Sequence, residues 1–203
     1  MGQREHGKSS RLYFFYGKGN ENNQFGTGFF VHHRILSAVM RVEFISDTTL
    51  YTALRGRWCH ITVLSVHAPR DDSKDNFYEE LDRVFHRFPK YHTKILLAEF
   101  NAKSGREDIF KPTIGNESLH QDSNDNRVGI VNLATSQNLV VKGTMLPDRN
   151  IHKYTWTSPD EKTHNQIHHI LIDWRWHSSI FDVRFFGGAD CDTDHYLVEK
   201  ESE

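Results

Sequence analysis

Short apolar segments separated by polar turns run through the first half of the chain and predict a strand-rich domain. A stretch rich in glycine and asparagine, residues 17–23, marks one of these turns. The five expected strands cover residues 12–16, 27–32, 36–40, 50–55 and 58–67. The last of them carries apolar residues at both odd and even positions, so we expect it to be buried on both faces.

Two segments instead repeat their apolar residues at helical spacing. Residues 74–88 form the first expected helix, which Pro89 ends because proline cannot continue the helical hydrogen-bond pattern. Residues 126–137 form the second, with Asn124 or Asp125 as its N-cap. The residues expected to face inward in this second helix are Val128, Val131 and Ala134.

The remaining apolar segments again have the length and composition of strands. They cover residues 94–100, 139–144, 154–157, 166–174 and 180–185, and a final strand that starts near residue 195. Many strands with only two helices predict an α+β domain in which two packed sheets are flanked by helices. We expect residues 1–203 to form a single domain, because no repeat or long linker interrupts the pattern.

Composition agrees with one globular domain and narrows the classes of partner. Of the 203 residues 37% are hydrophobic, and the formal net charge is -2, so nucleic-acid binding would need a local basic patch rather than bulk charge. Two cysteines, Cys59 and Cys191, are too few for a disulfide framework. Without a signal peptide or a membrane-spanning run, we expect an intracellular protein, in nucleus or cytoplasm, that is not secreted and does not contact a membrane.

Polar side chains at the ends of two expected strands are the candidates for chemistry. Glu99 and Asn101 lie two residues apart at a strand end, so both side chains point to the same side. Together a carboxylate and a carboxamide can hold a water molecule and a phosphate oxygen. Asp194 and His195 begin the last strand, where a carboxylate would orient the imidazole and make it a stronger base. Taken singly, each pair is more typical of an ordinary strand end or surface turn.

Other histidines are weaker candidates. His67 ends an expected strand and, on its own, is more typical of a packing or hydrogen-bonding residue than of a catalyst. His164 and His168 have the spacing of a zinc-binding helix, but their segment has the pattern of a strand, in which the two side chains would not converge in that way. No glutamate lies beside His164, so we do not expect a structural zinc site.

The order of these motifs along the chain is more specific than any one of them. The motifs are, in order, His67-Ala68-Pro69, Ala98-Glu99-Phe100-Asn101, Tyr154-Thr155-Trp156, Ile167-His168-His169-Ile170 and Thr193-Asp194-His195. This order resembles the endonuclease/exonuclease/phosphatase family, which includes abasic-site endonucleases and the nuclease domains of LINE-type retrotransposons. Longer stretches, over residues 101–117 and 190–196, resemble the RTE-type retroelement-derived domain of craniofacial development protein 2 and its relatives. The resemblance extends from about residue 12 to residue 198.

The resemblance implies a four-layer αββα sandwich of the DNase I-like type and a role for each motif residue. Glu99 takes the place of the aspartate that activates the attacking water, and Asn101 matches the asparagine that contacts the phosphate. Asp194 would help to hold Mg²⁺, with Mn²⁺ as the alternative ion, and Glu99 would share this role. His195 would steady the scissile phosphate, and His67 occupies the place of a tyrosine or histidine that faces it.

Departures from the family pattern predict weak metal binding and impaired catalysis. His168 stands where the family has the aspartate that orients the catalytic histidine, so we count it among the catalytic positions. Glu99 carries its carboxylate one methylene farther out than aspartate would. The resemblance further implies an N-terminally truncated domain that lacks the first strands and helix, together with the metal-binding glutamate. Glu5 lies nearby, but its neighbours do not match that motif.

Three functions stay open on the sequence. The first is a Mg²⁺-dependent phosphodiesterase of retroelement origin that acts on the DNA phosphate backbone with reduced activity. The second is a non-catalytic domain that binds protein or nucleic acid, because binding does not require the original residues at positions 99 and 168. The third is a decayed retroelement copy without a function. Whether the chain is an enzyme is therefore undecided, and no motif identifies a protein partner.

Overall fold

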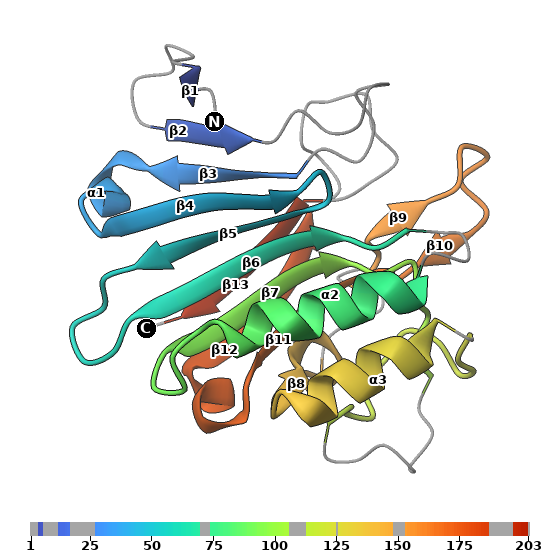
Figure 1. Cartoon of the computed structure of the whole chain (residues 1–203). Helices are drawn as coiled ribbons and strands as arrows, with labels where there is room; N and C mark the ends of the chain where they lie inside the picture. Colours follow the sequence, from blue (N-terminus) through green and yellow to red (C-terminus); the bar gives the residue numbers. More distant parts are fainter. Residues whose placement is uncertain are drawn as a thin grey trace.

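A mixed sheet of six strands lies at the centre of the computed structural model, which describes residues 4–5, 12–16, 27–69, 74–105, 113–124, 126–147, 153–186 and 197–202. In spatial order the strands are β4 (Val39–Ser46), β5 (Thr49–Leu54), β6 (Ile61–His67), β7 (Thr93–Glu99), β11 (His168–Asp173) and β8 (Leu139–Val141). All neighbours are antiparallel except β6 and β7, which are parallel and are connected through helix α2 (Lys74–His86). Figure 1 shows α2 and α3 (Arg127–Ser136) next to each other over one face of this sheet.

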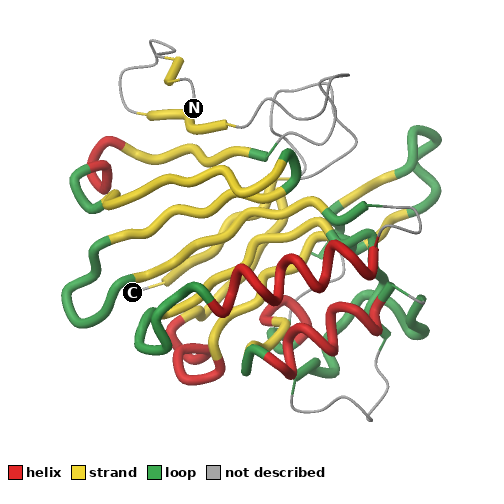
Figure 2. The backbone as a smooth tube through the Cα atoms, in the orientation of Figure 1, coloured by secondary structure: helices red, strands yellow, loops and turns green. Residues whose placement is uncertain are grey.

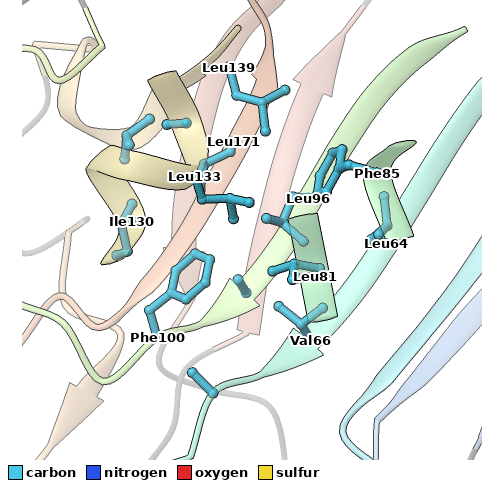
Figure 3. Close-up of a cluster of buried hydrophobic side chains, with 14 of the residues drawn as sticks. Leu64, Val66, Leu81, Phe85, Leu96, Phe100, Ile130, Leu133, Leu139 and Leu171 are labelled. Atoms are coloured by element: carbon cyan, nitrogen blue, oxygen red, sulfur yellow. The ribbon is translucent and has the colours of Figure 1, made fainter. Parts of the chain in front are cut away.

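The main core lies between this pair of helices and the sheet. Helix α2 buries one stripe of apolar side chains, which includes Leu81 and Phe85, because these residues recur at helical spacing. Figure 3 shows how they pack against Leu64 and Leu96 of the two parallel strands. Each of these four side chains is fully buried, so their burial fixes α2 over β6 and β7.

Smaller sheets complete the α+β architecture. The hairpin of β12 (Ile180–Phe186) and β13 (Leu197–Ser202) lies on the side of the central sheet away from the helices (Figure 1). The other strands are β1 (Arg4–Glu5), β2 (Leu12–Tyr16) and β3 (Gly28–His32) in one sheet, and β9 (Trp156–Thr157) and β10 (His164–Asn165) in another. Figure 2 shows the predominance of strand over helix that the sequence predicts. Among the described residues, no helix is long and apolar enough to cross a lipid bilayer.

Most predicted elements are confirmed, with shifts of one to three residues at their ends. The expected strand over residues 36–40 is wrong: a short helix, α1 (His33–Leu36), precedes β4, which starts only at Val39. The segment 139–144 is a strand only as far as Val141 and then forms a 3-10 turn, η2 (Lys142–Thr144). A second 3-10 segment, η4 (Trp174–Ser179), follows β11. Strand β6 is fully buried on one face only; its other face, toward the β12–β13 side, is half-buried.

The start and the buried face of α3 also differ from the prediction. Its N-cap is Asn126, one or two residues later than expected, and the Asn126 side chain makes no capping hydrogen bond. Val128 is 56% exposed, whereas Ile130 and Leu133 are buried together with the expected residues Val131 and Ala134. The difference arises because α3 contacts both α2 and the sheet, so that its buried stripe is shifted around the helix axis.

One buried histidine lies in this core beneath the strand ends. The His169 side chain on β11 is fully buried, and its Nε2 atom donates a hydrogen bond to the Ala102 carbonyl oxygen at 2.9 Å, when the tautomer carries the proton there. Burial, with smaller contributions from the nearby His168 and His120, lowers the pKa of His169 to about 4, although the hydrogen bond to Ala102 acts in the opposite direction. The ring is therefore neutral at neutral pH.

A glycine permits the close approach of the two helices. A Cβ atom on Gly129 of α3 would come within 2.2 Å of the Tyr78 ring of α2. In an unobstructed helix, replacing glycine by alanine stabilises by about 1 kcal/mol. Here we expect Gly129→Ala to lower the free energy of unfolding in urea by about 1–3 kcal/mol, because the added methyl overpacks the interface.

The matched control is the same substitution in a Tyr78→Ala background. There the methyl meets no ring, so Gly129→Ala should be neutral or stabilising. Equal destabilisation in both backgrounds would show that the Tyr78 contact is not the cause.

The buried neutral His169 makes stability depend on pH. Its pKa rises from about 4 in the folded chain to the ordinary value of 6.5 on unfolding. Between these two pH values His169 is therefore protonated in the unfolded chain and neutral in the folded chain. Between pH 7 and pH 5 this should lower the free energy of unfolding by about 2 kcal/mol. In His169→Gln that part of the pH dependence should disappear in urea titrations, whereas the exposed control His33→Gln should retain it. An unchanged pH profile in His169→Gln would contradict this account.

Candidate active site

The carboxyl end of β7 brings three polar side chains together on the sheet face away from the helices. In the parallel pairing of β6 and β7, His67 is opposite Glu99, and in the antiparallel pairing of β7 and β11, His168 is opposite the same Glu99. The three residues therefore form one row across three neighbouring strands. Their side chains are only 21%, 13% and 15% exposed, in the order His67, Glu99 and His168, so this row is largely shielded from water.

The Glu99 carboxylate lies between the two imidazoles. Its Oε2 atom is 3.6 Å from Nδ1 of His67 and 3.4 Å from Nε2 of His168. Each contact becomes an ion pair when the imidazole carries a proton, and low exposure makes that attraction stronger than it would be at the surface. The resemblance predicts that His168 stands beside the imidazole of His195, which lies outside the described residues. In the structure the described neighbour of His168 is instead the carboxylate of Glu99.

A pocket of about 370 Å³ lies beside this row. Its wall toward the middle of the sheet is apolar, with Val63, Leu97 and Ile170 among the lining residues, while the row of His67, Glu99 and His168 forms a polar end. A pocket that is apolar along one wall and has a few polar groups at one end is typical of a ligand site.

Asn101 follows β7 in a backbone conformation that is unusual for a residue other than glycine. Its φ angle is 52°, and asparagine tolerates this left-handed region better than most residues do. The Asn101 carbonyl oxygen accepts hydrogen bonds from the side-chain amides of Asn124, at 3.2 Å, and Asn126, at 2.8 Å. The Asn101 carboxamide in turn donates to the Ala68 carbonyl oxygen at 3.3 Å, which ties the ends of β6 and β7 together.

Three residues outside the predicted site residues position the site, namely Asn124, Asn126 and Thr155. Asn124 and Asn126 were considered only as helix caps or helix residues, yet they hold the Asn101 backbone. The buried hydroxyl of Thr155 accepts hydrogen bonds from the backbone N–H groups of Ile167, at 2.8 Å, and His168, at 3.1 Å. Thr155 thus fixes the start of β11. In the sequence, only the recurrence of asparagine around residue 125 points to Asn124 and Asn126.

The structure brings together four of the six predicted site residues, namely Glu99, Asn101, His67 and His168 at the ends of β6, β7 and β11. Asp194 and His195 lie outside the described residues. His164, the weaker candidate with the spacing of a zinc-binding helix, stacks on Tyr154 with ring centroids 4.2 Å apart.

The described side chains do not by themselves fit a Mg²⁺ site. Mg²⁺ takes oxygen ligands in near-octahedral geometry, and here the Glu99 carboxylate has imidazole nitrogens as its neighbours. Within the described ranges, no group of three or more His, Cys, Asp or Glu side chains is arranged to hold a metal ion.

Sequence comparison identifies relatives of the chain. No family model matches it. Craniofacial development protein 2 of Bos taurus is 28% identical over 177 residues, which are 85% of this chain and 30% of that protein. The protein of the same name from Tragulus javanicus matches with the same identity and coverage. The chain therefore spans less than a third of the length of these relatives.

Solved structures share the fold over most of the chain. The endonuclease domain of TRAS1, a telomere-specific non-LTR retrotransposon, has a TM-score of 0.62 at 13% identity and covers 92% of this chain and 78% of its own. The 3′ phosphatase NExo from Neisseria, bound to a product DNA hairpin, has a TM-score of 0.63 at 19% identity, with 88% and 75% covered. An endonuclease/exonuclease/phosphatase family protein from Leptotrichia buccalis has a TM-score of 0.64 at 13% identity, with 97% and 72% covered. The chain thus has the α+β, DNase I-like fold of the endonuclease/exonuclease/phosphatase proteins, and its sequence resembles craniofacial development protein 2.

Proposed function

We propose that this chain is a phosphodiesterase-like domain of retroelement origin that engages the DNA phosphate backbone and hydrolyses it only weakly. The shared fold with a retrotransposon endonuclease domain and with a phosphatase bound to a DNA hairpin supports this class. The positions of Glu99 and Asn101 at the carboxyl end of β7, beside a pocket, support a site for a phosphate and a water molecule.

The observation that carries the proposal is the contact of Glu99 with two imidazoles through one carboxylate oxygen. A general base must present a lone pair to the attacking water, and an oxygen engaged by a protonated imidazole is a weaker base. Glutamate also places its carboxylate one methylene farther out than aspartate, and a shift of about 1 Å can cost about 100-fold in rate. Both effects lower the rate while leaving the phosphate-binding geometry in place.

In the proposed reaction each described residue has a limited task. Glu99 accepts the proton of the water that attacks phosphorus, and His67 and His168 orient its carboxylate from the two neighbouring strands. Asn101, whose backbone is fixed by Asn124 and Asn126, contacts a phosphate oxygen through its carboxamide. Asp194 and His195 are proposed as the metal-side and phosphate-side partners from the family resemblance alone.

A non-catalytic binding domain is the second candidate, and the Glu99–His168 contact favours it. The two altered positions face each other at 3.4 Å and are chemically compatible, so the altered site is a consistent structure rather than a damaged one. A binding site would need compatible neighbouring side chains at these two positions, whereas it would not need a free general base at position 99.

Nicking of supercoiled plasmid in Mg²⁺ separates these two functions. The unmodified chain should nick slowly, and Glu99→Ala should abolish nicking because the base is lost. The double variant Glu99→Asp/His168→Asp should nick at least about 10-fold faster, since it restores the shorter carboxylate and removes the imidazole contact.

The control for the double variant is Glu99→Ala/His168→Asp, which has the same change on β11 but no base. Activity of this control equal to that of the restored variant, or nicking by Glu99→Ala at the unmodified rate, would indicate a contaminating nuclease. No nicking by any of the variants would favour the binding domain.

Mg²⁺ affinity provides an independent measurement. Calorimetric titration of the unmodified chain should show weak binding only, because Glu99 is flanked by nitrogen rather than oxygen ligands. Glu99→Asp/His168→Asp should bind Mg²⁺ more tightly, since it adds a carboxylate to the row. Tight binding by the unmodified chain, retained in Glu99→Ala, would place the metal elsewhere.

A further inference from the structure

Three loops meet at the end of the central sheet opposite to Glu99. They are the β5–β6 loop (residues 55–60), the α2–β7 loop (87–92) and η4, and Figure 1 shows all three at the end of the sheet away from β9 and β10. Hydrogen bonds connect them. The Thr93 N–H donates to the His60 carbonyl oxygen at 2.9 Å, and the Arg175 guanidinium donates to the Lys90 carbonyl oxygen at 2.8 Å.

Each of the three loops exposes large aromatic side chains. Trp58 is 86% exposed and Tyr91 is 67% exposed, and Trp174 and Trp176 in η4 are also exposed. Three of the four tryptophans of the chain are therefore at the surface of this one end. Exposure of several large aromatic rings in one region is typical of an interaction surface rather than of an inert one.

A cation accompanies the aromatic residues in every loop. Arg57 precedes Trp58 and lies over its ring, with the guanidinium carbon 5.2 Å from the ring centroid. Lys90 precedes Tyr91, and Arg175 lies between Trp174 and Trp176. We call these residues the three-loop patch: Arg57, Trp58, Lys90, Tyr91, Trp174, Arg175 and Trp176.

The local charge is positive although the whole chain carries a net charge of -2. Asp173, which precedes Trp174, is buried and already accepts hydrogen bonds from the Arg175 Nε and Nη2 atoms. Over the described residues, neither Arg57 nor Lys90 forms an ion pair with a carboxylate, and Arg55 and Arg87 in the same loops are likewise exposed and without one. The patch is therefore the local basic surface that the overall charge of the sequence did not reveal.

We propose that the three-loop patch binds single-stranded nucleic acid. Unpaired bases stack on aromatic side chains, and cations between those side chains neutralise the phosphates, so alternation of the two residue types matches the alternation of base and phosphate. Duplex DNA hides the faces of its bases and would leave the rings without partners. A protein partner could also cover aromatic residues, but four exposed cations, Arg55, Arg57, Arg87 and Lys90, form no ion pair with any carboxylate that the structure describes, and this favours a polyanion.

This binding surface is independent of the proposed phosphodiesterase site. The two lie at opposite ends of β7, and no residue belongs to both. Single-strand binding should therefore be observed whether or not the chain nicks plasmid DNA, and a failure of one proposal leaves the other intact.

Fluorescence anisotropy with labelled single strands of about 20 nucleotides, thymidine or uridine only, tests the proposal against a duplex of the same length. The chain should bind the single strands more tightly than the duplex. Trp58→Ala/Tyr91→Ala should weaken single-strand binding about 10-fold or more, because stacking contributes strongly for each base. The matched control is Phe30→Ala, which removes an aromatic ring that is 71% exposed on β3, outside the patch.

A second pair of variants tests the phosphate contacts. Arg57→Ala/Lys90→Ala removes two phosphate contacts and should reduce the slope of log affinity against log salt concentration by about 1.4, because about 0.7 counterion is released per phosphate contact on a single strand. The control Arg83→Ala/Lys162→Ala removes two exposed cations elsewhere and should leave the slope unchanged. Circular dichroism of every variant confirms that the fold is intact.

Several outcomes would overturn the proposal. These are no binding of either single strand by the unmodified chain, tighter binding of the duplex, or an equal loss of affinity in Phe30→Ala. Self-association that depends on Trp58 and Tyr91, in a chain that binds no oligonucleotide, would assign the patch to a protein interface instead.

Discussion

Because β6 and β7 are parallel neighbours, their carboxyl ends lie at the same edge of the sheet, and the contacts of His67 with Glu99 and of Asn101 with Ala68 depend on that arrangement. Parallel strands require a crossover connection, and α2 supplies it by burying Leu81 and Phe85 against the two strands it connects. The antiparallel addition of β11 then places His168 beside Glu99. A slip of one residue in either pairing would turn Glu99 away from its two imidazoles, because alternate side chains point to opposite faces.

Helices α2 and α3 are connected to the candidate site through the segment that leads into α3. The segment that leads into α3 contributes Asn124 and Asn126, whose amides hold the Asn101 carbonyl oxygen. Asn126 also accepts a hydrogen bond from Lys74, the first residue of α2, at 2.7 Å. Packing of the two helices and the conformation of the strand end are therefore coupled, which explains why the N-cap position of α3 is occupied by a residue whose side chain points elsewhere.

The sequence predicted the positions of the helices and strands more accurately than the contacts between them. Periodicity located α2, β7 and β11, since their apolar residues face a core on one or both sides. It failed at residues 36–40, where a short helix ends at Leu36 and β4 starts only at Val39, and at Val128, because the buried stripe of α3 depends on where α2 lies. Such tertiary contacts are not encoded in spacing along one segment.

The sequence identified residues of the candidate site but not which of their side chains are in contact. Motif order named Glu99, Asn101, His67 and His168, and the structure places these residues at neighbouring strand ends. The direct contact between Glu99 and His168 depends on the register of β7 and β11, which no single strand contains. The sequence likewise did not predict that the three aromatic loops lie side by side, because the loops are more than 30 positions apart in the sequence and come together only at the end of the sheet.

The length of β7 sets the distance between the two surfaces. Strand β7 extends over seven residues from Thr93 to Glu99, so its two ends are about 20 Å apart. A polymer held at the aromatic end could reach the carboxylate end only by following the outside of the sheet or by turning back on itself. The three-loop patch would then hold one segment of the polymer and raise the effective concentration of a distant segment near Glu99, although it would not place that segment directly in the candidate site.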